Sequence, residues 1–380
     1  MGSLQLCSIF LINFFMKVSC SKELLEKAVL KAKEATEKKA TLPILTNFLL
    51  EASDETLKVQ ATDLENYLSI KIPADIKEEG KVCINSQKLA VILKNTDCEE
   101  VILQTEGDNV IIRCGKSKFK LTTFDVNDYP EFPKKENIEK NLTFEGQLIL
   151  EAIKRVDYAI PKDAENLILN GMCIKTAPSE VHFVGTDGHR LALFKPAYEN
   201  TEEAQIVLPK KSLKVLKKLI TDLEEIEIEL TSNFAFISSE NWELITRLLE
   251  GEYPDYESVI PSETPINVEV DKEKLIKAIK RVSSLLEGKI KPVSISLKEN
   301  SLILRVSDPE FGEAEDLIEI VYQGEPLTVE FNSRFLIEAL NNFKAPVVML
   351  KLIDADSPMI IEPTDIKNEP YICLIMPMTI

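Results

Sequence analysis

One of the two histidines of the chain, His189, lies two residues after Asp187 in the stretch TDGHR (186–190). A carboxylate beside an imidazole is a pairing that serves general-base catalysis. A hydrolase would also need a nucleophile, and no nucleophile motif, glycine-rich phosphate loop or metal-ligand cluster accompanies this pair. A hydrolase is therefore the least favoured of three interpretations. We expect a non-catalytic protein with no catalytic residue, no metal and no cofactor.

The second chemistry that the sequence offers is cationic. The segment 209–220 (PKKSLKVLKKLI) carries five lysines and no acid, and the segment 272–281 (KEKLIKAIKR) carries five cations against the single Glu273. Cations on helices without interleaved aromatic side chains suit contact with the phosphates of duplex DNA, which reads no sequence. A solvated helix face is the alternative for any one helix. The candidate DNA-facing residues are Lys27, Lys31, Lys39, Lys154, Arg155, Lys210, Lys214, Lys217, Lys277, Lys280 and Arg281.

Composition limits the class of protein. The 380 residues are 44% hydrophobic and 28% charged, which predicts a globular protein of two to three domains. A formal net charge of −18 argues against a surface that coats nucleic acid generally, but it leaves local basic patches open. The seven cysteines include no CxxC pair, so we expect reduced, buried thiols and a cytoplasmic location rather than a disulfide framework or a zinc site.

The first fifteen residues, MGSLQLCSIFLINFF, form a short apolar run without a basic leading region. The run is shorter than the ~20 apolar residues that span a bilayer. We interpret residues 1–15 as an extension outside the fold, which begins near Met16, and a secretory signal is the alternative.

The elements that must position these side chains occur in three copies. The segments 21–33, 145–157 and 271–283 align at an offset of about 124 residues, and each has the apolar spacing of an amphipathic helix. A second set, 83–94, 207–218 and 330–341, aligns in the same register. Thr62-Asp63, Thr186-Asp187 and Ser307-Asp308 coincide between strand-like runs.

Two copies end with similar motifs, DYPEF at 128–132 and EYPDY at 252–256. Each motif is followed by a charged connector that contains proline. A period of domain size predicts a triplicated domain rather than a solenoid. The predicted fold class is α+β, with two helices and a mostly antiparallel sheet in each of three similar domains. Their expected bounds are 16–139, 140–264 and 265–380.

Several stretches resemble one family. They are TLPILTNFLLEA (41–52), TDLE (62–65), LILNGM (167–172), TDGHRLALF (186–194), YPDYESVIP (253–261), FNSRFLIEAL (331–340) and LIMPMTI (374–380). Together with the triplication they resemble the bacterial replicative sliding clamp, the beta subunit of DNA polymerase III, from about Met16 to Ile380. The resemblance implies a head-to-tail homodimeric ring that encircles duplex DNA without sequence specificity. It also implies a processivity role at the nucleoid, without membrane contact.

The resemblance implies protein partners and two further contact regions. The partners are the polymerase III alpha subunit, the clamp loader, and other replication and repair proteins that carry a short clamp-binding peptide. The implied peptide cleft comprises Leu169, Thr186, Gly188, His189, Arg190, Leu191, Pro254, Val259, Leu374, Ile375, Met376, Pro377 and Met378. The implied dimer interface comprises Phe119, Leu121, Lys116, Lys118, Leu285, Glu310, Glu313 and Asp316.

Each implied region has an alternative from the residues alone. The lysines around 115–124 are also typical of an ordinary edge strand protected by charge. The stretch LIMPM is also typical of a buried strand. Thr379 stands where relatives often place a basic residue, so the peptide preference is open. An oligomeric scaffold that does not bind DNA is the third interpretation of the whole chain, because the protein is acidic.

Overall fold

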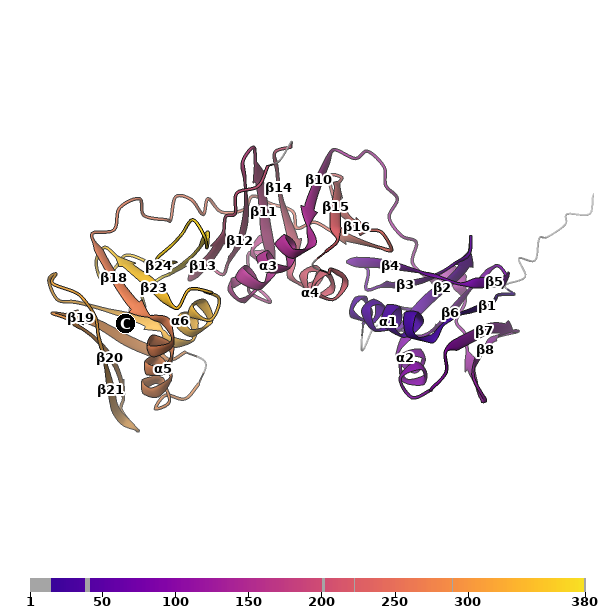
Figure 1. Ribbon diagram of the computed structural model, residues 1–380, viewed down its shortest axis with the longest axis horizontal. Coiled ribbons are helices and arrows are strands. Elements are labelled where there is room, and N and C mark those ends of the chain that lie inside the picture. The colour runs from indigo at the N-terminus through magenta and orange to yellow at the C-terminus, as the bar shows by residue number, and fades with distance from the viewer. Residues whose placement is uncertain (1–14, 38–41, 200–201, 222, 289, 379–380) are drawn as a thin grey trace, which may run out of the picture. The chain divides into compact units, whose positions relative to one another are not determined.

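The computed structural model describes residues 15–37, 42–199, 202–221, 223–288 and 290–378. The described chain divides into two compact units, each an α+β assembly of antiparallel strands (Figure 1). Unit 1 contains the described residues up to Glu139 together with Lys214–Ile220 and Glu224–Arg247; unit 2 contains those of Lys140–Leu213, Thr221–Leu223 and Leu248–Ile380. Among the described residues no helix is both long enough and apolar enough to cross a membrane.

Among the described residues, unit 1 contains two α-helices and twelve β-strands besides α4 (Lys210–Leu219), whose residues are divided between the units. The elements are β1 (Lys17–Ser21), α1 (Lys22–Ala32), β2 (Asn47–Ser53), β3 (Thr56–Thr62), β4 (Asn66–Pro73), β5 (Asp75–Glu78), β6 (Gly80–Asn85), α2 (Ser86–Lys94), β7 (Glu100–Glu106), β8 (Asn109–Cys114), β9 (Ser117–Thr122), β15 (Glu225–Leu230), β16 (Phe234–Ser239) and β17 (Trp242–Arg247). Their sheet orders are β5-β1-β7-β8-β9 and β15-β16-β17-β4-β3-β2-β6.

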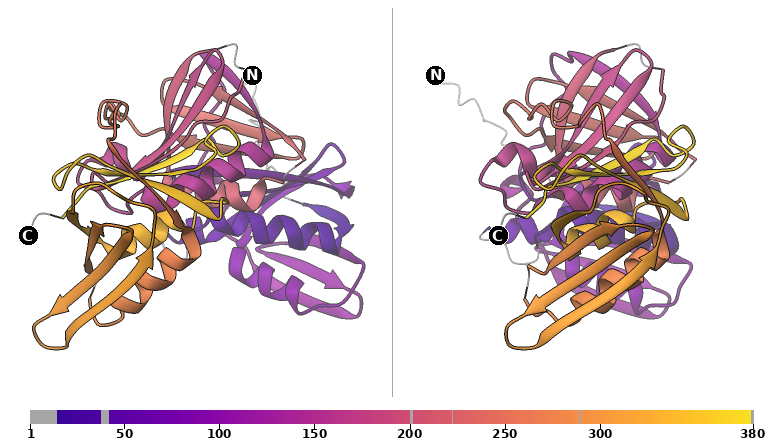
Figure 2. Two further views of the ribbon diagram at one scale, coloured as in Figure 1. Left: turned by 60° about the vertical axis from the view of Figure 1, so that its left-hand side comes forward. Right: turned by 90° about the vertical axis from the view of Figure 1, so that its left-hand side faces the viewer.

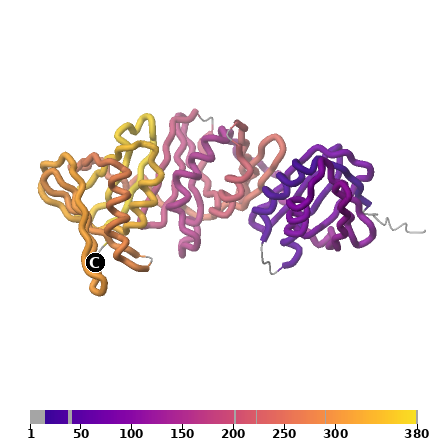
Figure 3. The backbone as a smooth tube through the Cα atoms, turned by 60° about the horizontal axis from the view of Figure 1, so that its bottom comes forward, coloured from indigo at the N-terminus to yellow at the C-terminus, as the bar shows by residue number. Residues whose placement is uncertain are grey.

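Unit 2 contains β10 (Lys140–Glu145), α3 (Gly146–Val156), β11 (Gly171–Ala177), β12 (Glu180–Thr186), β13 (Arg190–Phe194), β14 (Ala204–Pro209), β18 (Ile266–Asp271), α5 (Lys272–Ser283), β19 (Pro292–Lys298), β20 (Ser301–Asp308), β21 (Gly312–Glu319), β22 (Leu327–Asn332), α6 (Ser333–Leu340), β23 (Val347–Leu352), β24 (Met359–Pro363) and β25 (Tyr371–Ile375). Its two sheets have the orders β14-β11-β12-β13-β25-β24-β23-β18 and β21-β20-β19-β22. The pairing of β13 with β25 joins the second and third repeats in one sheet (Figure 3).

The predicted helices are confirmed, and the residues that begin them explain why. The side chain of Ser21 accepts the backbone N–H of Leu24 at the start of α1, and Asp271 accepts that of Lys274 at the start of α5. Such caps satisfy N–H groups that have no partner inside the helix. In α5 the apolar positions are buried and the lysines between them are exposed, so the helix packs with α6 and along β18–β21 on one side only (Figure 2).

The motif that the three repeats share is a turn. The hydroxyl groups of Thr62 and Thr186 donate to the carbonyl oxygens of Asn66 and Arg190, at 2.8 and 2.7 Å. The carboxylates of Asp63, Asp187 and Asp308 each accept backbone N–H groups two and three residues later. This is an Asx turn, which a short acidic side chain stabilises. The recurrence of an aspartate at this position in all three repeats, Asp187 of TDGHR included, therefore has a structural cause.

Candidate DNA, peptide and subunit contact surfaces

The predicted DNA-facing cations lie in different surroundings. Lys27, Lys154, Lys214, Lys217, Lys277, Lys280 and Arg281 are exposed. Lys27 pairs with Glu23 at 2.5 Å, and Arg281 pairs with Asp316 at 2.5 Å. Exposed pairs of this kind are weak, so both cations remain available to a polyanion. Lys39 lies outside the described residues.

Two other predicted cations are used inside the protein. The ammonium group of Lys31 donates to the carbonyl oxygen of Leu219 at 3.1 Å. That of Lys210 donates to the carbonyl oxygens of Asp157 and Ile160, and its side chain is 18% exposed. Both lysines connect a helix to a neighbouring backbone segment. Their ammonium groups are therefore occupied by hydrogen bonds to backbone carbonyl oxygens within the protein.

The assignment of Arg155 to the DNA-facing set is wrong. Its side chain is only 2% exposed, and its guanidinium forms ion pairs with Glu369 and with Glu151. It also donates to the carbonyl oxygen of Asn342 and lies 4.8 Å from the centre of the Tyr371 ring. The aligned Arg281 stays exposed beside Asp316, whereas Asn342, Glu369 and Tyr371 of the third repeat cover Arg155.

The environment of Glu369 matches this role. Burial opposes ionisation, but hydrogen bonds from the backbone N–H groups of Lys344 and Ala345 and from Arg155 hold the pKa of Glu369 below its ordinary value. The carboxylate therefore stays charged beside Arg155. The pair joins α3 to the segment before β25.

Two of the stretches that contribute predicted peptide-cleft residues come together on unit 2. Antiparallel pairing of β13 with β25 sets Arg190 opposite Ile375 and Leu191 opposite Leu374. The N–H of Met376 then donates to the carbonyl oxygen of His189 at 2.8 Å. The stretches 188–191 and 374–378, distant in sequence, thus lie side by side. Thr379 lies outside the described residues.

An apolar cluster underlies these stretches. Its buried members are Ile168, Cys173, Val184, Leu191, Leu193, Val207, Tyr253, Tyr256, Ile360 and Leu374, with the half-buried Leu169, Leu249, Ile260 and Ile372 packed against them. Three predicted residues nearby in the chain, Pro254, Val259 and Met376, are exposed, the last two at 48% and 38%. We call the set Leu169, Pro254, Val259, Ile372 and Met376 the apolar surface. Sequence reasoning missed Tyr253 and Tyr256, although the repeated DYPEF and EYPDY motifs contain the signal.

Polar contacts fix the surroundings of the apolar surface. The guanidinium of Arg190 binds Asp187 at 3.0 Å and Glu338 at 2.5 Å, and it lies 4.2 Å from the centre of the Phe335 ring. Arg190 is 7% exposed, so it positions β13 and is not a free ligand group. On the other side, His182 Nδ1 and the Tyr256 hydroxyl are hydrogen-bonded at 2.7 Å. The Asp187 carboxylate is therefore bound to Arg190, and none of these contacts joins it to the imidazole of His189 as a catalytic pair.

Most of the predicted dimer-interface residues lie on two strands at the ends of sheets, and the others lie outside these strands. β9 ends the five-stranded sheet of unit 1, with Phe119 and Leu121 half-buried on it and Lys116 and Lys118 exposed. β21 ends the four-stranded sheet of unit 2 and carries Glu313 and Asp316. Glu310 precedes it in an exposed turn, and Leu285 is half-buried after α5. Both strands therefore have one side without a paired strand among the described residues.

The prediction that all cysteines are reduced is wrong for two of them. Cys98 and Cys114 form a disulfide with a Cα–Cα distance of 5.6 Å. The β7–β8 register sets Val101 opposite Cys114, which returns the end of β8 to the residues before β7. The other described cysteines, Cys20, Cys83, Cys173 and Cys373, are free and buried. Burial raises the pKa of the first three thiols to about 12, so they are unreactive at neutral pH. Cys7 lies outside the described residues.

Comparison with known families and proteins identifies the family to which the chain that carries these surfaces belongs. Residues 16–133, 143–255 and 257–379 match the N-terminal, central and C-terminal domains of the DNA polymerase III beta subunit. This chain belongs to that family. It therefore functions as a DNA sliding clamp in replication, and neither a scaffold without DNA nor a hydrolase is favoured.

Individual relatives of the sliding-clamp family match along their whole length. The beta sliding clamp of Haemophilus influenzae is 30% identical over 367 residues, which cover 96% of this chain and 100% of the relative. The clamp of Escherichia coli K12 is 27% identical over the same shares. Among solved structures, the DNA polymerase III beta subunit of Pseudomonas aeruginosa matches with a TM-score of 0.91 at 26% identity, again over 96% of this chain and 100% of the other. The clamp from the same organism has also been solved bound to griselimycin, with a TM-score of 0.90 at 26% identity and the same coverage.

Proposed function

We propose that two copies of this clamp close head to tail into a ring around duplex DNA. The observation that carries the proposal is the pair of sheet-end strands with opposite charge. β9 (SKFKLT) presents Lys118 and Lys120, and β21 (GEAEDLIE) presents Glu313, Glu315 and Asp316. A strand with an open edge pairs readily with another strand, and complementary charge fixes which one. Joining β9 of one chain to β21 of the other at both ends closes a two-fold assembly and leaves neither β9 nor β21 with an open edge.

The rest of the proposal follows from the ring. Three domains, 16–139, 140–264 and 265–380, make up each half, and the exposed cations of the helices contact phosphates without reading bases. The ring catalyses nothing; by tethering the polymerase it raises the polymerase's concentration at its template. The polymerase III alpha subunit, the clamp loader, and other replication and repair proteins are the proposed partners, in the cytoplasm at the nucleoid.

A test of topological binding separates a ring from an ordinary DNA-binding protein. We expect the protein, once loaded on a nicked circular DNA by a clamp loader, to stay bound in high salt and to be lost when the circle is cut. Replacing Lys154, Lys214, Lys277 and Lys280 together by glutamate should reduce loading at least tenfold, because each reversal replaces attraction to a phosphate by repulsion. Replacing Lys71, Lys134, Lys298 and Lys367, which are exposed and lie outside the helices, in the same way is the matched control. Equal retention on circular and cut DNA would contradict the ring.

We also propose that the apolar surface binds the short peptides of clamp partners, and that griselimycin binds there too. An apolar surface with a methionine re-packs around different apolar anchors, which suits a site shared by many partners. We expect Val259→Glu with Met376→Glu to weaken griselimycin binding at least tenfold in calorimetry, since two exposed apolar side chains become charged. Ile290→Glu, an exposed apolar residue of the same unit, should leave binding unchanged. Equal weakening by the control would refute the assignment.

A further inference from the structure

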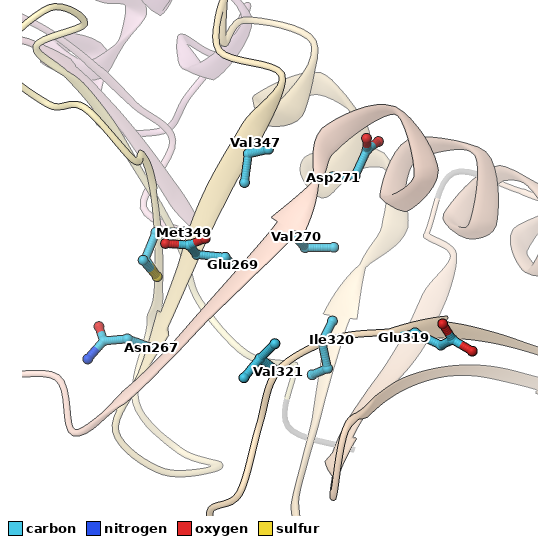
Figure 4. A pocket seen from close by; sticks show the side chains of 9 residues that line it. All are labelled: Asn267, Glu269, Val270, Asp271, Glu319, Ile320, Val321, Val347 and Met349. Carbon is cyan, nitrogen blue, oxygen red and sulfur yellow. The ribbon is translucent and has the colours of Figure 1, made fainter.

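A cavity of about 790 Å³ lies in unit 2 beside the strand β18 (Figure 4). It is lined by Asn267 and Glu269 of β18, by Val347 and Met349 of the neighbouring β23, and by Glu319 and Val321 at and just after the end of β21. Val321 is 87% exposed although it is apolar. None of these residues belongs to the predicted DNA, peptide or subunit contacts.

The cavity borders an unpaired sheet edge. β18 is the end strand of the eight-stranded sheet and pairs with β23 alone among the described strands, from Ile266 opposite Leu352 to Asp271 opposite Val347. The backbone groups on its other side therefore lack a neighbouring strand. Such an edge is a template for adding one more strand.

In the first repeat, the strand edge that corresponds to the open edge of β18 is paired with another strand. In unit 1 the short strand β5 pairs with the outer side of β1, where Lys17 lies opposite Glu78 and Ser19 opposite Asp75. The helix caps Ser21 and Asp271 align the two repeats. Positions 17–19 of β1 correspond to positions 267–269 of β18, which are the positions beside the cavity. The third repeat thus leaves open the place that β5 fills in the first.

Local hydrogen bonds keep the chain from filling this place itself. After β21, the N–H of Asn300 donates to the carbonyl oxygen of Tyr322 at 2.9 Å. The N–H of Ile320 donates to the carbonyl oxygen of Asn300 at 3.2 Å, but this bond has a counterpart from Ala74 to Glu55 in unit 1 and does not distinguish the repeats. The Tyr322 hydroxyl donates to the carbonyl oxygen of Glu325 at 2.6 Å. These contacts hold residues 320–325 against the turn between β19 and β20. In unit 1 the corresponding residues after β4 form β5 instead.

We propose that the open edge of β18 binds an extended segment of a partner protein as an added β-strand, with apolar and basic side chains in alternation. The main chain of such a segment supplies hydrogen bonds, and its alternate side chains read the surface. Glu269 and Asp271 lie directly opposite Met349 and Val347, so these four side chains share one face of the sheet, and Val270 lies on the other face. One set would therefore contact Val270 and Ile320. The other set would meet the three carboxylates of the lining, Glu269, Asp271 and Glu319. The described lining residues include no lysine or arginine that could neutralise them.

The test uses a synthetic probe, the acetylated and amidated heptapeptide Lys-Val-Lys-Val-Lys-Val-Lys with a fluorescent label, and the full-length protein without DNA. We expect saturable binding by fluorescence anisotropy. Glu269→Lys with Glu319→Lys should weaken it at least tenfold. Glu165→Lys with Glu199→Lys makes the same charge change at exposed positions of the same unit away from the cavity, and it should weaken binding less than twofold. Equal weakening by the two double variants would overturn the proposal, since attraction would then be to the acidic protein as a whole.

A second probe distinguishes strand addition from attraction between side chains. The same heptapeptide with N-methyl groups on the three valines keeps its charge and apolar groups but loses hydrogen-bond donors on one edge. An isomer methylated on three lysines loses donors on the other edge. We expect one of the two isomers to bind at least tenfold more weakly than the unmodified peptide. If both bind as tightly as the unmodified peptide, no strand is added and the proposal fails. Because no DNA, loader or polymerase is present, the outcome is independent of the ring proposed above.

Discussion

Arg155→Ala is expected to lower the free energy of unfolding of unit 2 by about 3–5 kcal/mol, which is the usual cost of leaving one charge of a buried pair without its partner. The guanidinium of Arg155 is the buried partner of Glu369 and Glu151, and it also bonds the carbonyl oxygen of Asn342. Its loss removes these contacts and the packing on the Tyr371 ring. Chemical denaturation followed by far-ultraviolet circular dichroism measures the change.

The neighbouring residue supplies the control. Lys154 precedes Arg155 in α3 but is exposed, so Lys154→Ala should change stability by less than about 0.5 kcal/mol. Arg155→Met with Glu369→Gln removes both charges and should be more stable than Arg155→Ala, because no unpaired buried charge remains. A loss below about 1 kcal/mol for Arg155→Ala would contradict the buried role.

Acidification provides a further check on the same pair. Because the pKa of Glu369 is lower in the folded protein than its ordinary value of 4.5, its contribution to stability is present above that value. The contribution is lost as the pH falls through the lowered folded pKa. The stability difference between the wild type and Arg155→Met with Glu369→Gln should therefore shift against the wild type on acidification. A difference that stays constant with pH would argue against linkage through Glu369.

Phe119→Asp with Leu285→Asp is expected to convert the proposed dimer to a monomer. Both side chains are half-buried beside the proposed contact of β9 with β21, and a carboxylate placed in an apolar contact loses its hydration without a partner. Apolar anchors at the centre of an interface typically cost 2 kcal/mol or more each when lost. We expect dimerisation to weaken at least about 100-fold, so the mass in sedimentation equilibrium should fall from twice 42.9 kDa to 42.9 kDa.

The control for this variant keeps the number of charges constant. Leu64 and Val321 are exposed apolar residues, one in each unit, and neither lies on β9 or β21. Leu64→Asp with Val321→Asp should leave the dimer mass unchanged. A dimer that survives Phe119→Asp with Leu285→Asp would place the subunit contact elsewhere, and a dimer lost in both variants would point to general destabilisation.

The sequence predicted the elements of this fold well because their signals are local. The apolar spacing in 271–283 and the capping residue Asp271 lie within one helix, and the structure has α5 at Lys272–Ser283. The aligned Thr-Asp pairs likewise depend on residues at most four positions away. The triplication and the family resemblance rest on such short stretches repeated along the chain.

Contacts between distant residues were not predictable in the same way. Cys98 and Cys114 looked like two more buried thiols, because their pairing depends on the register of β7 with β8. The open edge of β18 was also invisible, since it arises from hydrogen bonds that hold the segment after β21 elsewhere. Each outcome depends on strand register or on a competing contact, which a periodic pattern does not encode.

The contrast between Arg155 and Arg281 shows most clearly which features the sequence determined and which the tertiary structure decided. The sequence by itself determined three copies of one α+β unit, with a cation, Lys31, Arg155 or Arg281, at the same helical position in each. Only the tertiary structure decided that Arg155 is buried against Glu369 and that Arg281 stays exposed. The physical reason is that a helix position fixes the direction of a side chain, while its solvation and charge partner come from whatever distant chain packs over it.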